Sequence, residues 1–301
     1  MTIVVGFLTG DATILLTDSQ EVISDYSKTT TQKIQLMNYY GNWRLGIAAA
    51  AEDATYATAF CNDLQMYLSR VKEFDHSAIV KGIEAKLQEF YKRYVWTTPK
   101  DERPYFQMLI ALQGIKPQGS RALFYTHKNL LLPVHGYQSI GIGCHVADFV
   151  SRRLDISGNG RAIEGVVYNT PTEEMARFGV FVLDQVKSAV DGCDGETLGA
   201  IFYGDGTFRW LLGVEVKEIE SWFTAFYNDQ LPLLRLVSHP ETDDDEFERR
   251  LLQFNAGMRL LRTRQARDAQ TSSKRFAKFL EAQEKADKQQ PERSTTKKSK
   301  Q

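Results

Sequence analysis

Cysteine is scarce in this chain of 301 residues: Cys61, Cys144 and Cys193 lie far apart, and none belongs to a CxxC pair. The sequence therefore argues against a disulfide framework, and a reducing cytoplasm is the simplest location for the protein. Long apolar runs are also missing, so we expect no membrane-spanning helix. The first residues lack the basic segment and small-residue cleavage site of a signal peptide, and we expect none.

Net charge is almost absent too, at −1 for 37 basic and 38 acidic residues. This balance conceals two unlike parts. Residues 249–301 hold 15 basic and 5 acidic residues, a net charge of +10, whereas the rest of the chain is near −11. Such a basic arm is typical of contact with an acidic partner, nucleic acid or an anionic membrane. We favour a partner-docking helix, or an arm lying on the acidic body, over contact with nucleic acid.

Recognisable metal and cofactor motifs are missing as well. The five histidines have no metal-binding spacing. Gly141-Ile142-Gly143 precedes an expected helix but lacks the GxGxxG pattern of a phosphate-binding loop, so a close-packed turn is the simpler interpretation. Cys144 and His145 are sequence neighbours and point in different directions on a helix, which argues against a nucleophile and its base. We predict neither a metal nor a cofactor.

What the sequence does contain is an alternation of strand groups and helix groups. Short β-branched runs between turn residues predict strands, and apolar residues three or four positions apart predict helices. The expected strands are Ile3–Phe7, Thr13–Thr17, Lys33–Met37, Trp43–Ala48, Phe106–Gln113, Arg121–Thr126, Leu130–Val134, Thr197–Tyr203 and Thr207–Val214. The expected helices are Glu52–Val71, Ser77–Val95, His145–Leu154 and Thr172–Val190. This order predicts an α+β fold in which two sheets pack face to face and helix pairs cover their outer faces.

A change of composition predicts a C-terminal extension after this domain. A short helix, Glu218–Phe226, leads to Pro232 and Pro240, and lysine, glutamine, serine and threonine dominate the end of the chain. The expected parts are a domain over 1–216, a helical extension and linker over 217–240, a charged amphipathic helical arm over 241–281, and a disordered basic tail over 282–301.

The first expected hairpin places a threonine near a carboxylate. Facing residues in a tight antiparallel hairpin have position numbers with a constant sum, so a turn centred on Gly10 puts Thr2 opposite Asp18. The turn near residue 40 puts Lys33 opposite Ala48 or Ala49 in the same way. If the two hairpins lie side by side, a hydroxyl, a carboxylate, an ammonium group and a backbone N–H meet at one sheet end.

These groups are the parts of an N-terminal nucleophile site. Because the Thr2 side chain is small, methionine aminopeptidase can remove Met1, and the freed α-amine, with an ordinary pKa of about 7.7–8.0, suits a general base. Lys33 would lower the pKa of that amine, Asp18 would orient Lys33, and a backbone N–H near Ala49 would form an oxyanion hole. The alternative is a structural ion pair between Asp18 and Lys33, with Thr2 as an ordinary second residue.

Several motifs in their order along the chain resemble 20S proteasome β-subunits and the bacterial ATP-dependent threonine peptidase. They are TIVVGF, ATILLTDSQ, QKIQL, RLGIAAAAEDA, SIGIGCHVA and VDGCDGETLGAIFYGDG, and together they cover roughly residues 2–214. The resemblance implies a four-layer αββα sandwich of the N-terminal nucleophile (Ntn) hydrolases, assembly into a homo-oligomeric ring, and cleavage of peptide or protein substrates. By the same resemblance Thr2 is the nucleophile, Asp18 the orienting carboxylate, Lys33 the lysine that sets the pKa, and Asp191 the aspartate that supports the terminal threonine.

Three positions depart from the pattern of that family. Ala49 stands at the oxyanion position where glycine is usual, so a methyl group is expected to intrude where substrate lies. Ile142 and Asp194 each stand where a serine is usual, and the serine replaced by Ile142 would bond the terminal amine. The departures keep a second hypothesis open, namely a catalytically inactive scaffold or assembly protein whose basic C-terminal arm docks a partner.

Overall fold

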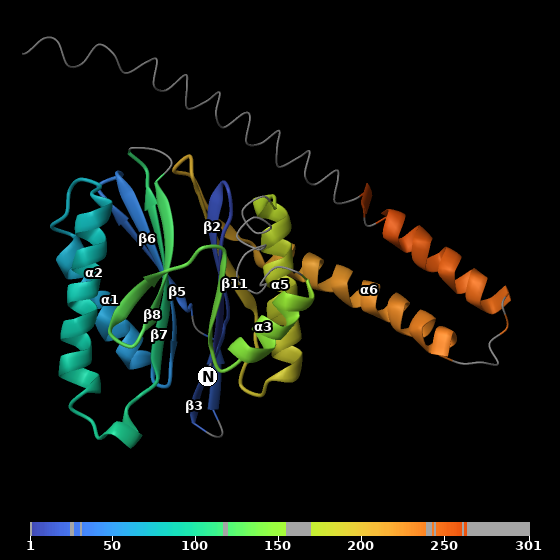
Figure 1. Ribbon diagram of the computed structural model, residues 1–301, viewed down its shortest axis with the longest axis horizontal. Coiled ribbons are helices and arrows are strands. Elements are labelled where there is room, and N and C mark those ends of the chain that lie inside the picture. Colours follow the sequence, from blue (N-terminus) through green and yellow to red (C-terminus); the bar gives the residue numbers. More distant parts are fainter. Residues whose placement is uncertain are drawn as a thin grey trace, which may run out of the picture. The chain divides into compact units, whose positions relative to one another are not determined.

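The computed structural model describes residues 2–24, 27–30, 32–116, 120–154, 170–238, 243, 245–260 and 262–263. The chain divides into two compact units, Met1–Ser221 and Trp222–Gln301. The first unit carries all the candidate site residues, and its layers are visible in Figure 1.

Two five-stranded antiparallel sheets form the centre of the first unit. The first sheet has the order β10 (Tyr137–Gly141), β1 (Ile3–Leu8), β2 (Ala12–Asp18), β11 (Thr197–Tyr203), β12 (Phe208–Leu211). The second has the order β5 (Ile34–Tyr39), β6 (Trp43–Ala51), β7 (Phe106–Gly114), β8 (Arg121–His127), β9 (Leu130–Pro133). A separate hairpin pairs β3 (Gln20–Ser24) with β4 (Ser27–Thr30).

The inner faces of the two sheets enclose one apolar core. Val4 and Leu15 of the first sheet and Leu109 of the second are fully buried in it. Phe202 of β11 lies so close to Gly46 of β6 that a side chain at Gly46 would collide with the ring. Close packing of this kind fixes how one sheet sits on the other, which matters because residues from both sheets meet at the site.

Helices cover both outer faces, as Figure 1 shows. Helices α1 (Ala54–Leu68) and α2 (His76–Phe90) bury an apolar stripe against the second sheet, and the π-helical turn η1 (Tyr91–Val95) continues α2. On the first sheet lie α3 (Cys144–Arg153) and α5 (Thr172–Ala189). Aspartate N-caps explain where α1 and α2 begin. Asp53 accepts a hydrogen bond from Thr55 N at 2.8 Å, and Asp75 accepts one from Ala78 N at 3.0 Å.

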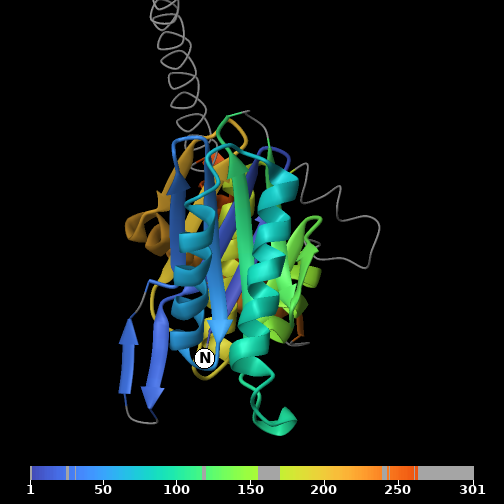
Figure 2. The same cartoon turned by 90° about the vertical axis from the view of Figure 1, so that its left-hand side faces the viewer.

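The site lies at one end of this sandwich. Figures 1 and 2 place the N-terminal end of β1 at the same end as the β3–β4 hairpin. The segment after α2, which includes the 3₁₀ turn η2 (Lys100–Glu102), reaches that end as well (Figure 2). The β3–β4 hairpin and the segment after α2 therefore lie at the same end of the sandwich as the start of the chain.

The predicted arrangement of two antiparallel sheets with helices on both sides is confirmed. Strands β3, β4 and β10 were not among the predicted strands. Helix α6 (Gly213–Ser238) is longer than the predicted helix and runs through Pro232, and the predicted boundary after residue 216 falls within it. A further helix occupies 245–260, whereas the predicted tail, 282–301, and most of the basic arm lie outside the described residues. None of the described helices is long and apolar enough to cross a membrane.

Candidate functional site

The register of the first hairpin differs from the prediction by one residue. Val4 pairs with Thr17, so the position sum is 21, and Ile3, not Thr2, aligns with Asp18. The turn has two central residues, Gly10 and Asp11, because Thr9 N donates to the carbonyl of Ala12 at 2.8 Å. The hydroxyl of Thr9 also accepts from Ala12 N at 2.9 Å and closes the turn from the other side.

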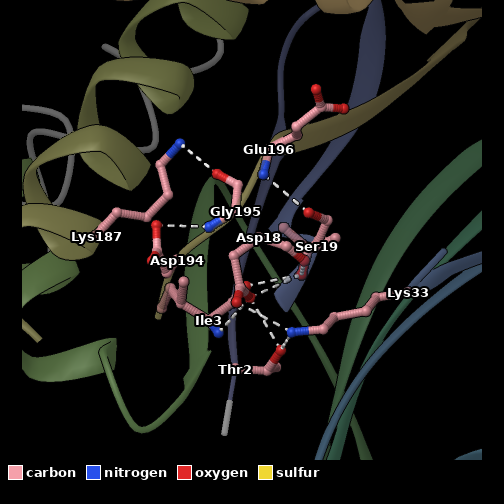
Figure 3. Close-up of polar contacts among 10 residues, drawn as sticks. Thr2, Ile3, Asp18, Ser19, Lys33, Lys187, Asp194, Gly195 and Glu196 are labelled. Carbon is pink, nitrogen blue, oxygen red and sulfur yellow. Dashed lines mark hydrogen bonds and ion pairs between the residues drawn. The ribbon is translucent and has the colours of Figure 1, made fainter. Parts of the chain in front are cut away.

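Asp18 nevertheless accepts a hydrogen bond from the Thr2 hydroxyl. Its carboxylate is fully buried, and Oδ1 accepts from Thr2 Oγ1 at 2.9 Å and from Ile3 N at 3.0 Å (Figure 3). The one-residue shift is what brings the Ile3 N–H to the carboxylate. Thr2 lies just before the strand, and it is 6% exposed.

Lys33 reaches the same carboxylate from the second sheet. Ile34 pairs with Ala48, which agrees with the predicted register of the second hairpin and places Lys33 immediately before β5. Its ammonium group lies 3.0 Å from Asp18 Oδ2 and also contacts Thr2 Oγ1. The structure thus brings Thr2, Asp18 and Lys33 together, with the Lys33 side chain only 11% exposed.

This arrangement favours removal of the Thr2 hydroxyl proton. A positive charge against a hydroxyl oxygen in a poorly solvated site stabilises the alkoxide that forms when the proton leaves. Asp18 neutralises the buried ammonium and fixes its position, which a partly buried charge requires. The chemistry available is therefore nucleophilic attack by an activated hydroxyl.

The backbone of Thr2 is held by the turn that follows β10. The Thr2 carbonyl accepts from Ile142 N at 3.0 Å, and Ile3 pairs with Gly141. Gly141 has a φ of +101°, and a side chain there would collide with the Thr2 carbonyl oxygen. Ile142 therefore contributes a backbone donor to Thr2, while its side chain is 44% exposed.

Asp191 lies exposed in the turn after α5. Among the described residues no hydrogen bond or ion pair joins its side chain to Thr2, and its support of the terminal threonine stays a prediction. The same loop contacts the start of β3, where Gln20 N donates to the Asp194 carbonyl at 3.2 Å. The Asp194 carboxylate accepts from Gly195 N at 2.7 Å, so this side chain stabilises its own loop.

Ser19 and Lys187, which the sequence did not single out, fix this loop beside Asp18. Glu196 N donates to Ser19 Oγ at 2.8 Å, and Lys187 Nζ donates to the Gly195 carbonyl at 3.3 Å (Figure 3). Gly195 has a φ of +80°, and a Cβ there would lie 2.6 Å from Ser19 Oγ. The position of Ser19 directly after Asp18 was the available signal for its role.

A buried thiol also lies beside the site. Cys193 is 1% exposed, and burial raises the pKa of its thiol to about 11. Asp18 raises this pKa further, and Lys33 lowers it. A thiol of this kind is neutral near pH 7 and is a poor nucleophile there.

The methyl group of Ala49 faces the helices that cover the second sheet. It packs against the core between the second sheet and helices α1 and α2, on the side of β6 away from the first sheet. The next residue, Ala50, faces the first sheet, and its Cβ lies 3.3 Å from the Cβ position of Gly141. Ala49 and Ala50 lie on opposite faces of β6 because side chains alternate along a strand, and the expected obstruction of substrate by Ala49 stays a prediction.

Other charged clusters in the first unit are ion-pair networks. Arg209 bonds Glu173 at 2.5 Å and Glu215 at 3.0 Å, and Lys187 bonds Glu220 at 2.8 Å. Within the described part of the chain, no group of three or more histidine, cysteine, aspartate or glutamate side chains is arranged to hold a metal ion.

Solved structures of Anbu proteins share this fold. They include Anbu (ancestral beta-subunit) from Yersinia bercovieri, with a TM-score of 0.61 and 13% identity over 76% of this chain and 96% of that chain. A helical assembly of the Anbu complex from Pseudomonas aeruginosa has a TM-score of 0.60 and 13% identity over 81% of this chain and 99% of that chain. The Anbu (Gly-1) mutant from Hyphomicrobium sp. strain MC1 has a TM-score of 0.59 and 11% identity over 77% of this chain and 97% of that chain.

No protein-family model matches the chain, and no curated protein sequence matches it significantly. At identities of 10–13% the structural likeness establishes the fold alone, which this chain shares with the Anbu structures. The proteasome-like sandwich expected from the sequence is therefore supported at the level of fold.

Proposed function

We propose that the protein is a cytoplasmic, threonine-type N-terminal hydrolase that cleaves peptide or amide bonds with Thr2 after removal of Met1. The observation that carries the proposal is the contact of the Thr2 hydroxyl with both the Lys33 ammonium and the Asp18 carboxylate. Sequence reasoning had selected the same three residues from hairpin geometry. The substrate in this proposal is a peptide or protein, and no metal or cofactor takes part.

In the proposed reaction, Thr2 Oγ1 attacks the carbonyl carbon of the scissile amide while the α-amine of Thr2 accepts the hydroxyl proton. A backbone N–H near Ala49 holds the oxyanion, and Lys33 stabilises the negative charge that develops on the attacking oxygen. The C–N bond then breaks, the leaving amine takes the proton, and an ester remains on Thr2. Water hydrolyses the ester and restores the hydroxyl. We retain Asp191 as the group that supports the free amine.

We also propose that the protein works as a homo-oligomer. The Pseudomonas aeruginosa Anbu complex forms a helical assembly, and that protein shares the fold of this chain. Size-exclusion chromatography with light scattering tests this part, and a monomer at micromolar concentration would contradict it.

The decisive experiment begins with the intact mass of the purified protein. The expected mass lacks Met1, and quantitative retention of Met1 rejects the mechanism because the α-amine then belongs to another residue. Turnover of fluorogenic peptides should disappear in Thr2→Ala and persist in Thr2→Ser, which keeps a hydroxyl. Thr58→Ala is the matched control, since the exposed Thr58 hydroxyl bonds the Ala54 carbonyl of its own helix at 3.2 Å, and the activity of this variant should equal that of the wild type.

An inactive scaffold is the second candidate function. It is favoured by Ile142, which offers no hydroxyl to the amine of Thr2, and by the exposed position of Asp191, which has no hydrogen bond to Thr2 within the described part of the chain. On this alternative, mature protein that lacks Met1 assembles but shows no turnover dependent on Thr2. Deletion of residues 249–301 would then remove binding of a partner without affecting the sandwich. Turnover that is lost in Thr2→Ala excludes this alternative.

A further inference from the structure

Tyr105 forms a second bridge between the two sheets at the site end. It directly precedes β7 of the second sheet, and its hydroxyl oxygen accepts from Gly141 N, at the end of β10 in the first sheet, at 3.0 Å. The same hydroxyl donates to the side-chain carbonyl of Gln107. Tyr105 therefore links the second sheet to the residue whose turn holds Thr2.

The Tyr105 backbone is anchored on both sides, which makes its hydroxyl a fixed point. Tyr105 N donates to the Glu52 carboxylate at 3.2 Å, and Glu52 N donates to the Tyr105 carbonyl at 3.0 Å. Burial raises the pKa of the phenol, which therefore stays neutral and both accepts and donates. The ring itself is 43% exposed, so its polar contacts rather than its burial distinguish it.

The hydrogen bond between Tyr105 and Gly141 matters because the residue after Gly141 makes a further hydrogen bond to Thr2. Ile142 N, in the residue after Gly141, donates to the Thr2 carbonyl at 3.0 Å. With isoleucine at 142, no side-chain hydroxyl from this turn is available to Thr2. The turn therefore acts on Thr2 through its backbone, and its position fixes the Thr2 carbonyl while Asp18 and Lys33 hold the hydroxyl.

We propose that Tyr105 is a positioning residue, which holds the Gly141–Ile142 turn and, through it, the Thr2 backbone beside Lys33. The effect on turnover rests on the proposed hydrolase function. The effect on the turn does not, because it concerns only a hydrogen bond between the two sheets.

The test compares Tyr105→Phe with the wild type in two measurements. Hydrogen exchange by mass spectrometry on peptides covering 137–143 should become about fivefold faster, as expected for the loss of one hydrogen bond. The kcat for a fluorogenic peptide should fall about tenfold or more with KM nearly unchanged, because misplaced groups slow the chemical step more than they weaken binding. The melting temperature should change little.

Tyr40→Phe is the matched control. Its hydroxyl also bonds a backbone group, the Ser69 carbonyl at 2.7 Å, but at the β5–β6 turn. It should change neither the exchange at 137–143 nor kcat. Unchanged exchange in Tyr105→Phe overturns the proposal, and so does faster exchange with unchanged kcat in an active enzyme. If the wild type has no turnover dependent on Thr2, the hydrolase proposal fails, and the exchange measurement alone decides whether Tyr105 holds the turn.

Discussion

Lys33 Nζ lies 3.0 Å from Asp18 Oδ2, although the two residues belong to opposite sheets of the sandwich. Asp18 ends β2, and Lys33 immediately precedes β5. The ion pair therefore exists only while the two sheets keep their relative position, which packing such as that of Phe202 against Gly46 enforces. Stability of the core and geometry of the site are coupled through this pair.

Replacing Asp18 with asparagine tests this coupling. Asp18→Asn keeps the shape of the side chain but leaves the partly buried Lys33 ammonium without a counter-charge. We expect a loss of about 3 kcal/mol in the free energy of unfolding and a fall in peptide turnover of about 100-fold or more. Urea unfolding and kcat measure the two effects.

Glu89→Gln serves as the control for charge removal. Glu89 pairs with Lys86 at 2.6 Å, but its side chain is 66% exposed, and such surface pairs contribute about 0–1 kcal/mol. The control should leave turnover unchanged. Equal effects of Asp18→Asn and Glu89→Gln would mean that the Asp18–Lys33 pair has no special role.

Gly141→Ala tests whether the turn after β10 must approach Thr2 closely. Alanine is strained at the φ of +101°, and its methyl group would collide with the Thr2 carbonyl oxygen. We expect turnover to fall by about 100-fold, since Thr2 must move. Gly41→Ala is the control with similar strain, because Gly41 has a φ of +69° and open space around its Cβ position. It should cost about 1 kcal/mol of stability and no activity; equal activity of the two variants would contradict the prediction.

The convergence of Thr2, Asp18 and Lys33 could be predicted because it depends on two local hairpins. Strand alternation and turn position are encoded within a few residues, and the second hairpin had the predicted register, with Ile34 opposite Ala48. The first register was wrong by one residue because the turn has two central residues, Gly10 and Asp11, so its centre lies between them and not at Gly10. The predicted contact between Thr2 and Asp18 still forms, because Thr2 lies just before β1 and its side chain reaches the carboxylate without being paired with it.

The roles of Tyr105 and Ser19 could not be predicted in the same way. Each acts across a long sequence separation, from Tyr105 to Gly141 and from Ser19 to Glu196. Such contacts depend on how sheets and loops pack, and no periodic pattern marks them. Strand β10 escaped prediction for a related reason: it has only five residues and gains its identity by pairing with β1.

Ser19→Ala tests the attachment of the 191–196 loop to β2. The substitution leaves Glu196 N without its acceptor and should cost about 1 kcal/mol of stability. If the loop supports the amine of Thr2, kcat should fall about tenfold and the pH profile of turnover should shift, since the environment of the general base changes. Ser188→Ala is the control, because the exposed Ser188 hydroxyl bonds only the Gln185 carbonyl at 2.8 Å. A pH profile identical to that of the wild type would remove the loop from the mechanism.

The raised pKa of the Cys193 thiol predicts a loss of stability at alkaline pH. Burial raises the pKa of its thiol from 9.0 to about 11, so between these values the unfolded chain releases a proton that the folded protein keeps. This contribution is fully present below pH 9 and is lost as the pH rises through 11, by at most about 2–3 kcal/mol. In Cys193→Ala the lost packing of the sulfur atom lowers stability at every pH, but the decline from pH 9 to 11 should be smaller than in the wild type. Urea unfolding of both proteins at pH 8, 9.5 and 11 measures the difference, and parallel declines would show that Cys193 titrates as in the unfolded chain.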